Sequence, residues 1–190
     1  FRLHASLRKT LKRFRAAPGC AVRFDGAFDE VVRQCAERPR DGGGGGTWIL
    51  PSMRAAYGAL HRAGLAHSVE TWIDGELAGG LYGIALGRVF FGESMFTRRS
   101  DASKIAFAHL VAQLRRWQFQ LIDCQQQTAH LASLGAAPIA RGEFLRALER
   151  WIPEPARHVA SGAAVPRAGH WRFEADLLDS LLTSPQGAGI

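Results

Sequence analysis

Apolar residues recur at every third or fourth position in several stretches of the chain, and this spacing predicts amphipathic helices. Four longer helices are expected over residues 3–15, 27–37, 51–64 and 101–117, and two shorter ones over 128–135 and 141–151. Pro51 near the start of the third helix and Gly64 near its end are typical helix boundaries.

Other stretches are rich in β-branched and aromatic residues and are too short for helices, which predicts strands. They cover residues 20–24, 67–73, 77–86, 88–96 and 118–124. The dipeptide Asp74-Gly75 predicts a hairpin between the second and third strands. Gly87 predicts a turn between the third and fourth.

The order of these elements predicts an α/β (α+β) domain in which helices flank both faces of a mixed sheet. Acyltransferases of the acetyltransferase-like superfamily share this order. We expect one domain over residues 1–150 and a loosely held tail over 151–190, where proline, glycine and alanine dominate. The stretch 38–46 is expected to be a mobile loop because it is rich in glycine, and no Lys-Ser or Lys-Thr follows it to make a phosphate-cradling pattern.

The amino-acid composition indicates the kind of binding partner and the cellular compartment. The chain has 190 residues, of which 47% are hydrophobic, which is typical of a globular protein. Its formal net charge of +7 favours a polyanionic partner, with RNA the leading candidate. Its three cysteines have no paired spacing and are expected to be reduced thiols in the cytoplasm. No apolar run approaches the roughly 20 residues that a bilayer requires, so no membrane association is expected.

The stretch LIDCQQQ, residues 121–127, ends an apolar strand with an acid, a thiol and three glutamines. Side chains at positions i and i+2 of a strand share a face. Asp123 and Gln125 are therefore expected to point together, and Cys124 to point the other way, into the core. A site for polar chemistry is one interpretation of this strand end, and a cap for a neighbouring helix is the other.

Five segments, in order along the chain, resemble the leucyl/phenylalanyl-tRNA–protein transferase family. They are GTWI (46–49), AHSVETW (66–72), GGLYGIALG (79–87), FFGESMF (90–96) with ASK (102–104), and LIDCQ (121–125) with HLASLGA (130–136). With the N-terminal helix and strand, the resemblance reaches to about Leu148. The family also has a segment with a Trp-Trp-Ser-Pro-type motif ahead of the basic helix, and the printed sequence begins after it. That segment helps to build the family's aminoacyl-adenosine site, so the resemblance leaves open whether this chain alone is active.

This resemblance implies an enzyme that moves Leu or Phe from aminoacyl-tRNA to the N-terminal amine of proteins that begin with Arg or Lys. The products are marked for degradation by the bacterial N-degron pathway. The tRNA ester is already activated, so no coenzyme and no metal are expected, and we expect a cytoplasmic monomer. His61, His67 and His130 have no companion acids at metal-ligand spacing.

The resemblance places Asp123, Gln125 and Glu93 at the reacting centre. Gln125 is expected to orient the amine through its carbonyl oxygen while Asp123 holds the amide. A relay through this pair and proton transfer through the adenosine hydroxyl both remain open. Glu93 is expected to bind either the amino group of the esterified residue or the basic side chain of the acceptor.

Three further groups of residues follow, each with a purely structural alternative. An apolar slot for the Leu or Phe side chain, or else ordinary core, is expected at Leu81, Phe90, Met95 and Ile122. Trp48 is expected to stack on the terminal adenine, or to pack in the core. Phosphates of the acceptor stem, or else solvent, are expected to face Arg8, Lys9, Lys12 and Arg13.

Two other functions fit parts of the sequence. An acyl-CoA-dependent N-acyltransferase of the same fold would carry a glycine-rich pyrophosphate cradle between the strand 88–96 and the helix 101–117, where this chain has one glycine. A non-catalytic RNA-binding module would not need Asp123, Gln125 and Glu93 together.

Overall fold

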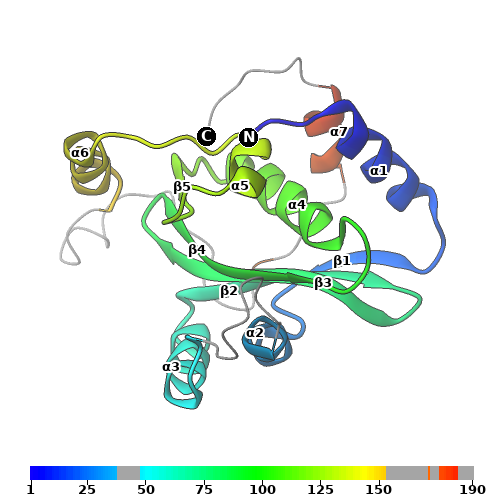
Figure 1. Ribbon diagram of the computed structural model, residues 1–190, viewed down its shortest axis with the longest axis horizontal. Helices are drawn as coiled ribbons and strands as arrows, with labels where there is room; N and C mark the ends of the chain where they lie inside the picture. Colours follow the sequence, from blue (N-terminus) through cyan, green and yellow to red (C-terminus); the bar gives the residue numbers. More distant parts are fainter. Residues whose placement is uncertain (38–47, 153–170, 172–175, 184–190) are drawn as a thin grey trace.

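The computed structural model describes residues 1–37, 48–152, 171 and 176–183, and the statements below refer to these residues (Figure 1). The glycine-rich stretch 38–46 lies outside the described residues. So does most of the predicted tail, 151–190, and the division of the chain at residue 150 stays a prediction. Helices in the described ranges are all too short or too polar to cross a bilayer.

Five strands form one mixed sheet, as predicted. Their order across the sheet follows the sequence: β1 (Cys20–Phe24), β2 (Ala66–Ile73), β3 (Glu76–Leu86), β4 (Val89–Thr97) and β5 (Leu121–Asp123). The first three pairings are antiparallel, and β5 lies parallel to β4. A parallel pair needs a long crossover, and the helix between β4 and β5 supplies it. The closer likeness to acetyltransferases stays a prediction.

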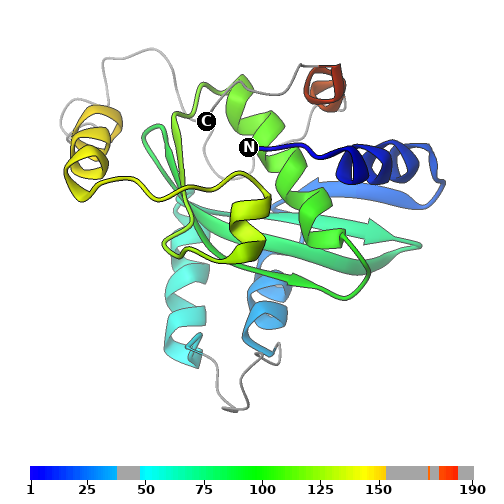
Figure 2. The same cartoon turned by 45° about the horizontal axis from the view of Figure 1, so that its top comes forward.

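Helices cover both faces of the sheet (Figures 1 and 2). One face carries α1 (Ala5–Ala16), α4 (Ala102–Arg116), α5 (Ala129–Ser133) and α7 (Leu177–Thr183). The opposite face carries α2 (Phe28–Glu37) and α3 (Pro51–Arg62). The last helix before the tail, α6 (Arg141–Trp151), stands apart from the sheet, and its final carbonyl accepts the Arg88 N–H at 2.8 Å.

The helix α4 is buried along almost its whole circumference, which its predicted amphipathic pattern does not show. Of residues 102–114, only Lys104 is not buried. The sheet, α1 and α7 all pack against this helix. The helix is therefore the centre of the larger core cluster.

Part of the predicted tail contributes to this core. Trp171 is 2% exposed and stacks on His67, with ring centroids 3.7 Å apart. In α7 the buried residues Leu177, Leu178 and Leu181 pack in the same cluster.

The turns that connect the strands match their sequence signals. Asp74 and Gly75 both have positive φ, 53° and 79°, as a two-residue hairpin of the Asp-Gly kind requires. Gly87 also has positive φ, 56°. The strand predicted over 118–124 is shorter, Leu121–Asp123, because Gln118 and Gln125 have positive φ (59° and 56°) at its two sides.

The strands β4 and β5 part soon after they meet. Their pairing covers only Val89–Phe91 against Leu121–Asp123. Beyond it, β4 pairs with β3 alone, and Glu93 is an extra residue there, since Gly83 pairs with Gly92 and Tyr82 with Ser94. Such a bulge bends a strand and redirects a side chain. An opening in the sheet follows from these two features.

A glycine in β3 keeps this region closely packed, which gives a test of the fold. A Cβ at Gly83 would lie 2.3 Å from the Phe91 carbonyl oxygen and 2.5 Å from the Phe90 ring. We expect Gly83→Ala to lower the free energy of unfolding by about 3 kcal/mol, because the backbone cannot move aside. Gly142→Ala in α6 is the control, since its Cβ makes no contact shorter than 3.4 Å, and it should stabilise slightly, by about 0.5 kcal/mol. Urea unfolding measures both, and equal effects would contradict the packing described.

Candidate active site

A cavity of about 510 Å³ opens where β4 and β5 part. This volume lies within the range of about 300–1,000 Å³ that is usual for ligand pockets. Its walls come from β3, β4, β5 and α4, from the segment that follows β5, and from Trp48 ahead of α3. Segments far apart in the sequence therefore meet at one opening in the sheet.

The four residues predicted to form the apolar slot all line this cavity. Leu81 and Phe90 are 3% and 1% exposed, while Met95 and Ile122 are half-buried. Two further apolar walls, Phe107 and Leu110, come from α4 and were not predicted. Their spacing of three residues marks one helix side, but a helix buried on all sides hides which of its residues face a cavity.

Glu93 lines the same cavity from the bulge in β4. Its Oε2 accepts a hydrogen bond of 2.7 Å from the Tyr57 hydroxyl on α3. Burial, and secondarily this contact with Glu93, raises the pKa of Tyr57. The hydroxyl therefore stays protonated and donates a hydrogen bond. One carboxylate oxygen is thus fixed by Tyr57. The other carries no hydrogen bond from the described residues.

A turn, and not the alternation of a strand, sets how Asp123 and Gln125 lie relative to each other. The strand ends at Asp123, and its Oδ1 accepts the backbone N–H of Gln125 at 2.8 Å. Gln125 has a φ of 56° and is exposed, and its side chain lines the cavity. Asp123 is not among the residues that line it. The acid therefore shapes the turn that aims the glutamine.

The predicted orientation of Cys124 is wrong. Cys124 lines the cavity together with Ile122, its neighbour at i−2 on the same strand face. The sequence predictions for these two residues were incompatible, since alternation places both on one side. Burial raises the pKa of the Cys124 thiol, and the negative charge of Asp123 adds to this effect.

Trp48 is 38% exposed and lines the cavity at its rim, so it is not a core residue. Further rim residues that the sequence reasoning missed follow β5: Gln126, Thr128, His130 and Leu131. Thr128 caps α5 by accepting the Leu131 N–H at 3.1 Å, which holds this rim in place. The polar run before a short helix was the available signal.

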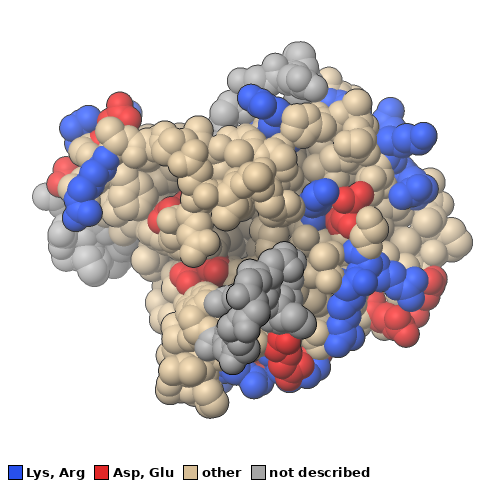
Figure 3. Space-filling model, viewed as in Figure 1, with Lys and Arg blue, Asp and Glu red and all other residues tan. Residues whose placement is uncertain are grey.

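The predicted basic residues of α1 lie away from the cavity lining. The helix is held by Leu7, Leu11 and Phe14, which are buried against the core. On its outer side Lys9, Lys12 and Arg13 are exposed and Arg8 is half-buried. Within the described residues these four form no ion pair, whereas Arg15 pairs with Asp179 of α7. Figure 3 shows the Lys and Arg atoms of this region at its upper right.

Within the described ranges, no group of three or more His, Cys, Asp or Glu side chains could hold a metal ion.

Comparison with known proteins identifies the family. The family model described as leucyl/phenylalanyl-tRNA protein transferase matches residues 1–149. The chain belongs to this family. It is 58% identical over 156 residues to the leucyl/phenylalanyl-tRNA–protein transferase of Leptothrix cholodnii, which covers 82% of the chain and 60% of that relative.

Two more relatives of the same name agree. The protein of Albidiferax ferrireducens is 52% identical over 183 residues, 96% of the chain and 67% of that protein. The protein of Bordetella petrii is 59% identical over 162 residues, 83% of the chain and 63% of that protein. The chain thus spans about two thirds or less of the length of these relatives. The resemblance predicted from the five segments is confirmed.

The thiol of Cys124 gives a test of the cavity wall. Only a thiolate reacts with iodoacetamide, and a raised pKa leaves less thiolate at neutral pH. We expect alkylation of Cys124 in the folded chain to be slow at pH 7 and to rise about tenfold per pH unit up to its pKa, which lies above that of an ordinary cysteine. Mass spectrometry of the peptide gives the rate, with the urea-unfolded chain as control. Equal rates at pH 7 in the folded and unfolded chains would contradict this environment.

Proposed function

We propose that this chain carries the catalytic domain of an aminoacyltransferase, which moves Leu or Phe from aminoacyl-tRNA to the N-terminal amine of proteins beginning with Arg or Lys. The observation that supports it most is the single cavity in which an apolar slot meets Glu93 and Gln125. The family match over residues 1–149 supplies the reaction class.

The apolar half of the cavity suits the side chain of the esterified residue. Leu81, Phe90 and Ile122 offer only hydrocarbon, so the slot selects by size and burial. Met95 is unbranched and flexible, which lets one slot accept both a branched aliphatic and an aromatic side chain. The 3′-terminal adenine stacks on the half-exposed ring of Trp48.

The polar half of the cavity suits an amine that attacks an ester. The neutral amine of the acceptor protein forms a bond to the ester carbonyl carbon, and the bond from that carbon to the ribose oxygen breaks. The proton that the amine loses ends on this ribose oxygen, which becomes a hydroxyl. A primary amide is too weak a base to take this proton unaided. Gln125 therefore orients the amine by its carbonyl oxygen.

Asp123 acts through Gln125 in this proposal. Its carboxylate accepts the Gln125 backbone N–H and so fixes the turn, which replaces the expectation that it holds the side-chain amide. Glu93, held by Tyr57, binds a cation, either the ammonium of the esterified residue or the basic side chain of the acceptor. No coenzyme is required, because the ester is already activated.

The rest of the proposal follows from the family. The transferase acts as a cytoplasmic monomer, its products are marked for N-degron degradation, and the basic side of α1 binds acceptor-stem phosphates. Activity depends on the family's N-terminal segment, which contributes to the aminoacyl-adenosine site. Transfer is therefore tested with the chain preceded by that segment.

Labelled Phe-tRNA and a peptide that starts with Arg separate the candidate functions. We expect Asp123→Ala, which removes the acceptor of the Gln125 N–H, and Gln125→Ala each to lower transfer about 100-fold, the size of a lost polar contact in the transition state. The double variant should be little worse than the worse single variant, because the two residues act as one unit.

Gln127→Ala is the matched control, because Gln127 belongs to the same glutamine run but does not line the cavity. Its transfer rate should match that of the unmodified chain. Transfer from acyl-CoA but not from Phe-tRNA would point to the acyl-CoA enzyme. Binding without any transfer would point to an RNA-binding module.

The tRNA surface has its own test. Replacing Arg8, Lys9, Lys12 and Arg13 by Gln should lower the slope of log affinity against log salt by about 0.9 for each phosphate contact with duplex RNA that is lost. Fluorescence anisotropy with labelled tRNA measures the slope between roughly 50 and 300 mM salt. An unchanged slope would place the RNA away from α1.

A further inference from the structure

Arg98 is an exposed cation that a neutral partner holds in place. It follows the last residue of β4, and its Nε–H donates to the side-chain oxygen of Gln34 on α2 at 3.0 Å. Within the described residues no carboxylate lies at ion-pair distance from it. Its neighbour Arg99, in contrast, pairs with Glu76 at 3.2 Å.

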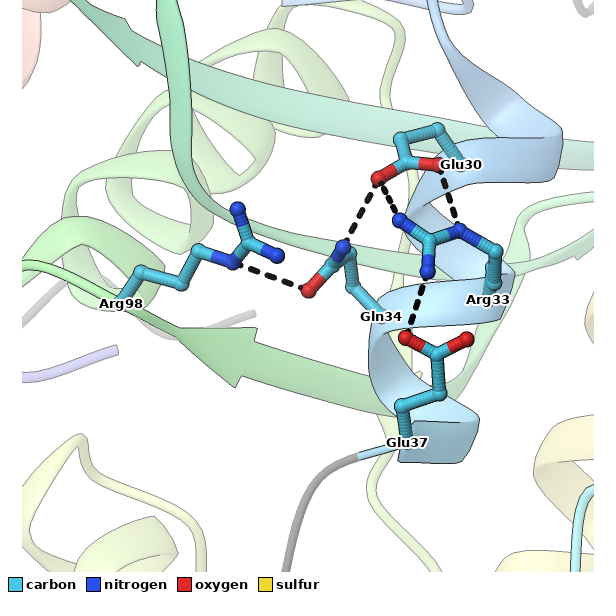
Figure 4. Close-up of polar contacts among 5 residues, drawn as sticks. All are labelled: Glu30, Arg33, Gln34, Glu37 and Arg98. Atoms are coloured by element: carbon cyan, nitrogen blue, oxygen red, sulfur yellow. Dashed lines mark hydrogen bonds and ion pairs between the residues drawn. The ribbon is translucent and has the colours of Figure 1, made fainter.

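A chain of hydrogen bonds along α2 fixes the partner of Arg98 (Figure 4). Gln34 donates its amide N–H to Glu30 at 2.8 Å, so its oxygen must face Arg98. Glu30 also accepts two hydrogen bonds from Arg33, at 2.8 and 2.5 Å, and Arg33 donates a third to Glu37 at 2.5 Å. Gln34 is only 7% exposed. The orientation of Arg98 is thus set by a network on a neighbouring helix.

The charges of this network are consistent with that orientation. The hydrogen bonds from Arg33 lower the pKa of Glu30 most, and the charge of Arg98 also contributes. Glu30 is therefore a carboxylate at neutral pH, and the amide of Gln34 lies between it and Arg98. The two cations are not equivalent. Arg33 donates its hydrogen bonds to carboxylates, while Arg98 donates one to an amide oxygen.

This arrangement leaves a planar donor group ready for an anion. A guanidinium has five N–H donors, and four of those of Arg98 are unused by the described residues. An arginine side chain loses rotamer entropy when it is ordered, and Gln34 provides part of that order in advance. Its two terminal nitrogens match the spacing of phosphate oxygens, which they bind in a bidentate way.

The loop that carries Arg98 lies against the basic helix α1. The Thr10 hydroxyl donates to Asp101 at 3.4 Å, and Lys104 binds the same carboxylate at 2.8 Å. Asp101 therefore joins this loop to α1, while Arg98 of the same loop turns to α2 on the other face of the sheet. Figure 3 shows Lys and Arg atoms from the upper right down along the right-hand side. Met95, which lines the cavity, lies three residues before Arg98, about 10 Å of extended chain.

We propose that Arg98 binds a backbone phosphate of the RNA whose 3′ end occupies the cavity, with Gln34 as its positioning residue. The RNA surface then runs from α1 across the β4–α4 loop towards the cavity. This inference rests on the proposed function, because it takes the polyanion to be the aminoacyl-tRNA. It adds a contact from a second element, on the side of the sheet that carries α2.

The test compares two adjacent arginines in the full chain. Arg98→Gln and Arg99→Gln each remove one positive charge, so their effects on the distant field are equal. A direct phosphate contact at Arg98 predicts that Arg98→Gln lowers the log–log salt slope of tRNA binding by about 0.7–0.9, while Arg99→Gln leaves it unchanged. Equal slopes for the two variants and the unmodified chain would overturn the proposal.

A third variant tests the role of Gln34. Gln34→Leu keeps the size and burial of the side chain but cannot orient Arg98, so it should weaken tRNA binding without lowering the affinity of the Arg98→Gln variant any further. Circular dichroism melting checks that each variant is folded. Additive losses for Gln34→Leu and Arg98→Gln would show that Gln34 does not act through Arg98.

Two outcomes separate this inference from the proposed function. If the α1 variant flattens the salt slope and Arg98→Gln does not, only the inference is wrong. If the unmodified chain binds no tRNA, the proposed function and the inference both fail. Binding of a poly-glutamate peptide through Arg98, with tRNA binding unaffected by Arg98→Gln, would show that the anion is an acidic protein segment and would refute the RNA contact.

Discussion

The short pairing between β4 and β5 is the constraint on which the site depends. Three residues of each strand are joined, and then the bulge at Glu93 and the turn at Gln125 carry the strands apart. A fully paired sheet would fill this space with backbone hydrogen bonds, and no side chain could enter it. Because the sheet opens here, residues from both of its faces reach one cavity.

The two sides of the sheet give this cavity two different environments. The α4 side contributes Phe107 and Leu110 and belongs to the larger core, which excludes water and favours an apolar side chain. The α3 side contributes Tyr57, whose hydroxyl fixes one oxygen of Glu93. An apolar group and a cation can therefore be bound in the same cavity, as the proposed function requires of an esterified amino acid.

Most of the fold follows from local patterns, whereas several site features do not. Helical spacing and the Asp74-Gly75 signal gave the helices and the hairpin because these depend on neighbours in the sequence. The burial of α4 on all sides depends on α7, which lies more than 60 residues further along the chain. Alternation holds for Ile122 and Cys124, which both line the cavity, and fails at Gln125, because β5 ends at Asp123 and a positive φ at Gln125 turns the chain.

The sequence by itself determined the family, the mixed sheet and four of the residues that line the cavity, because motifs and periodicity are properties of neighbouring residues. Only the tertiary structure decided which side chains meet. Tyr57 reaches Glu93 and Gln34 holds Arg98 across separations of 36 and 64 residues. Such contacts depend on how the helices pack on the sheet, and packing depends on the whole chain at once.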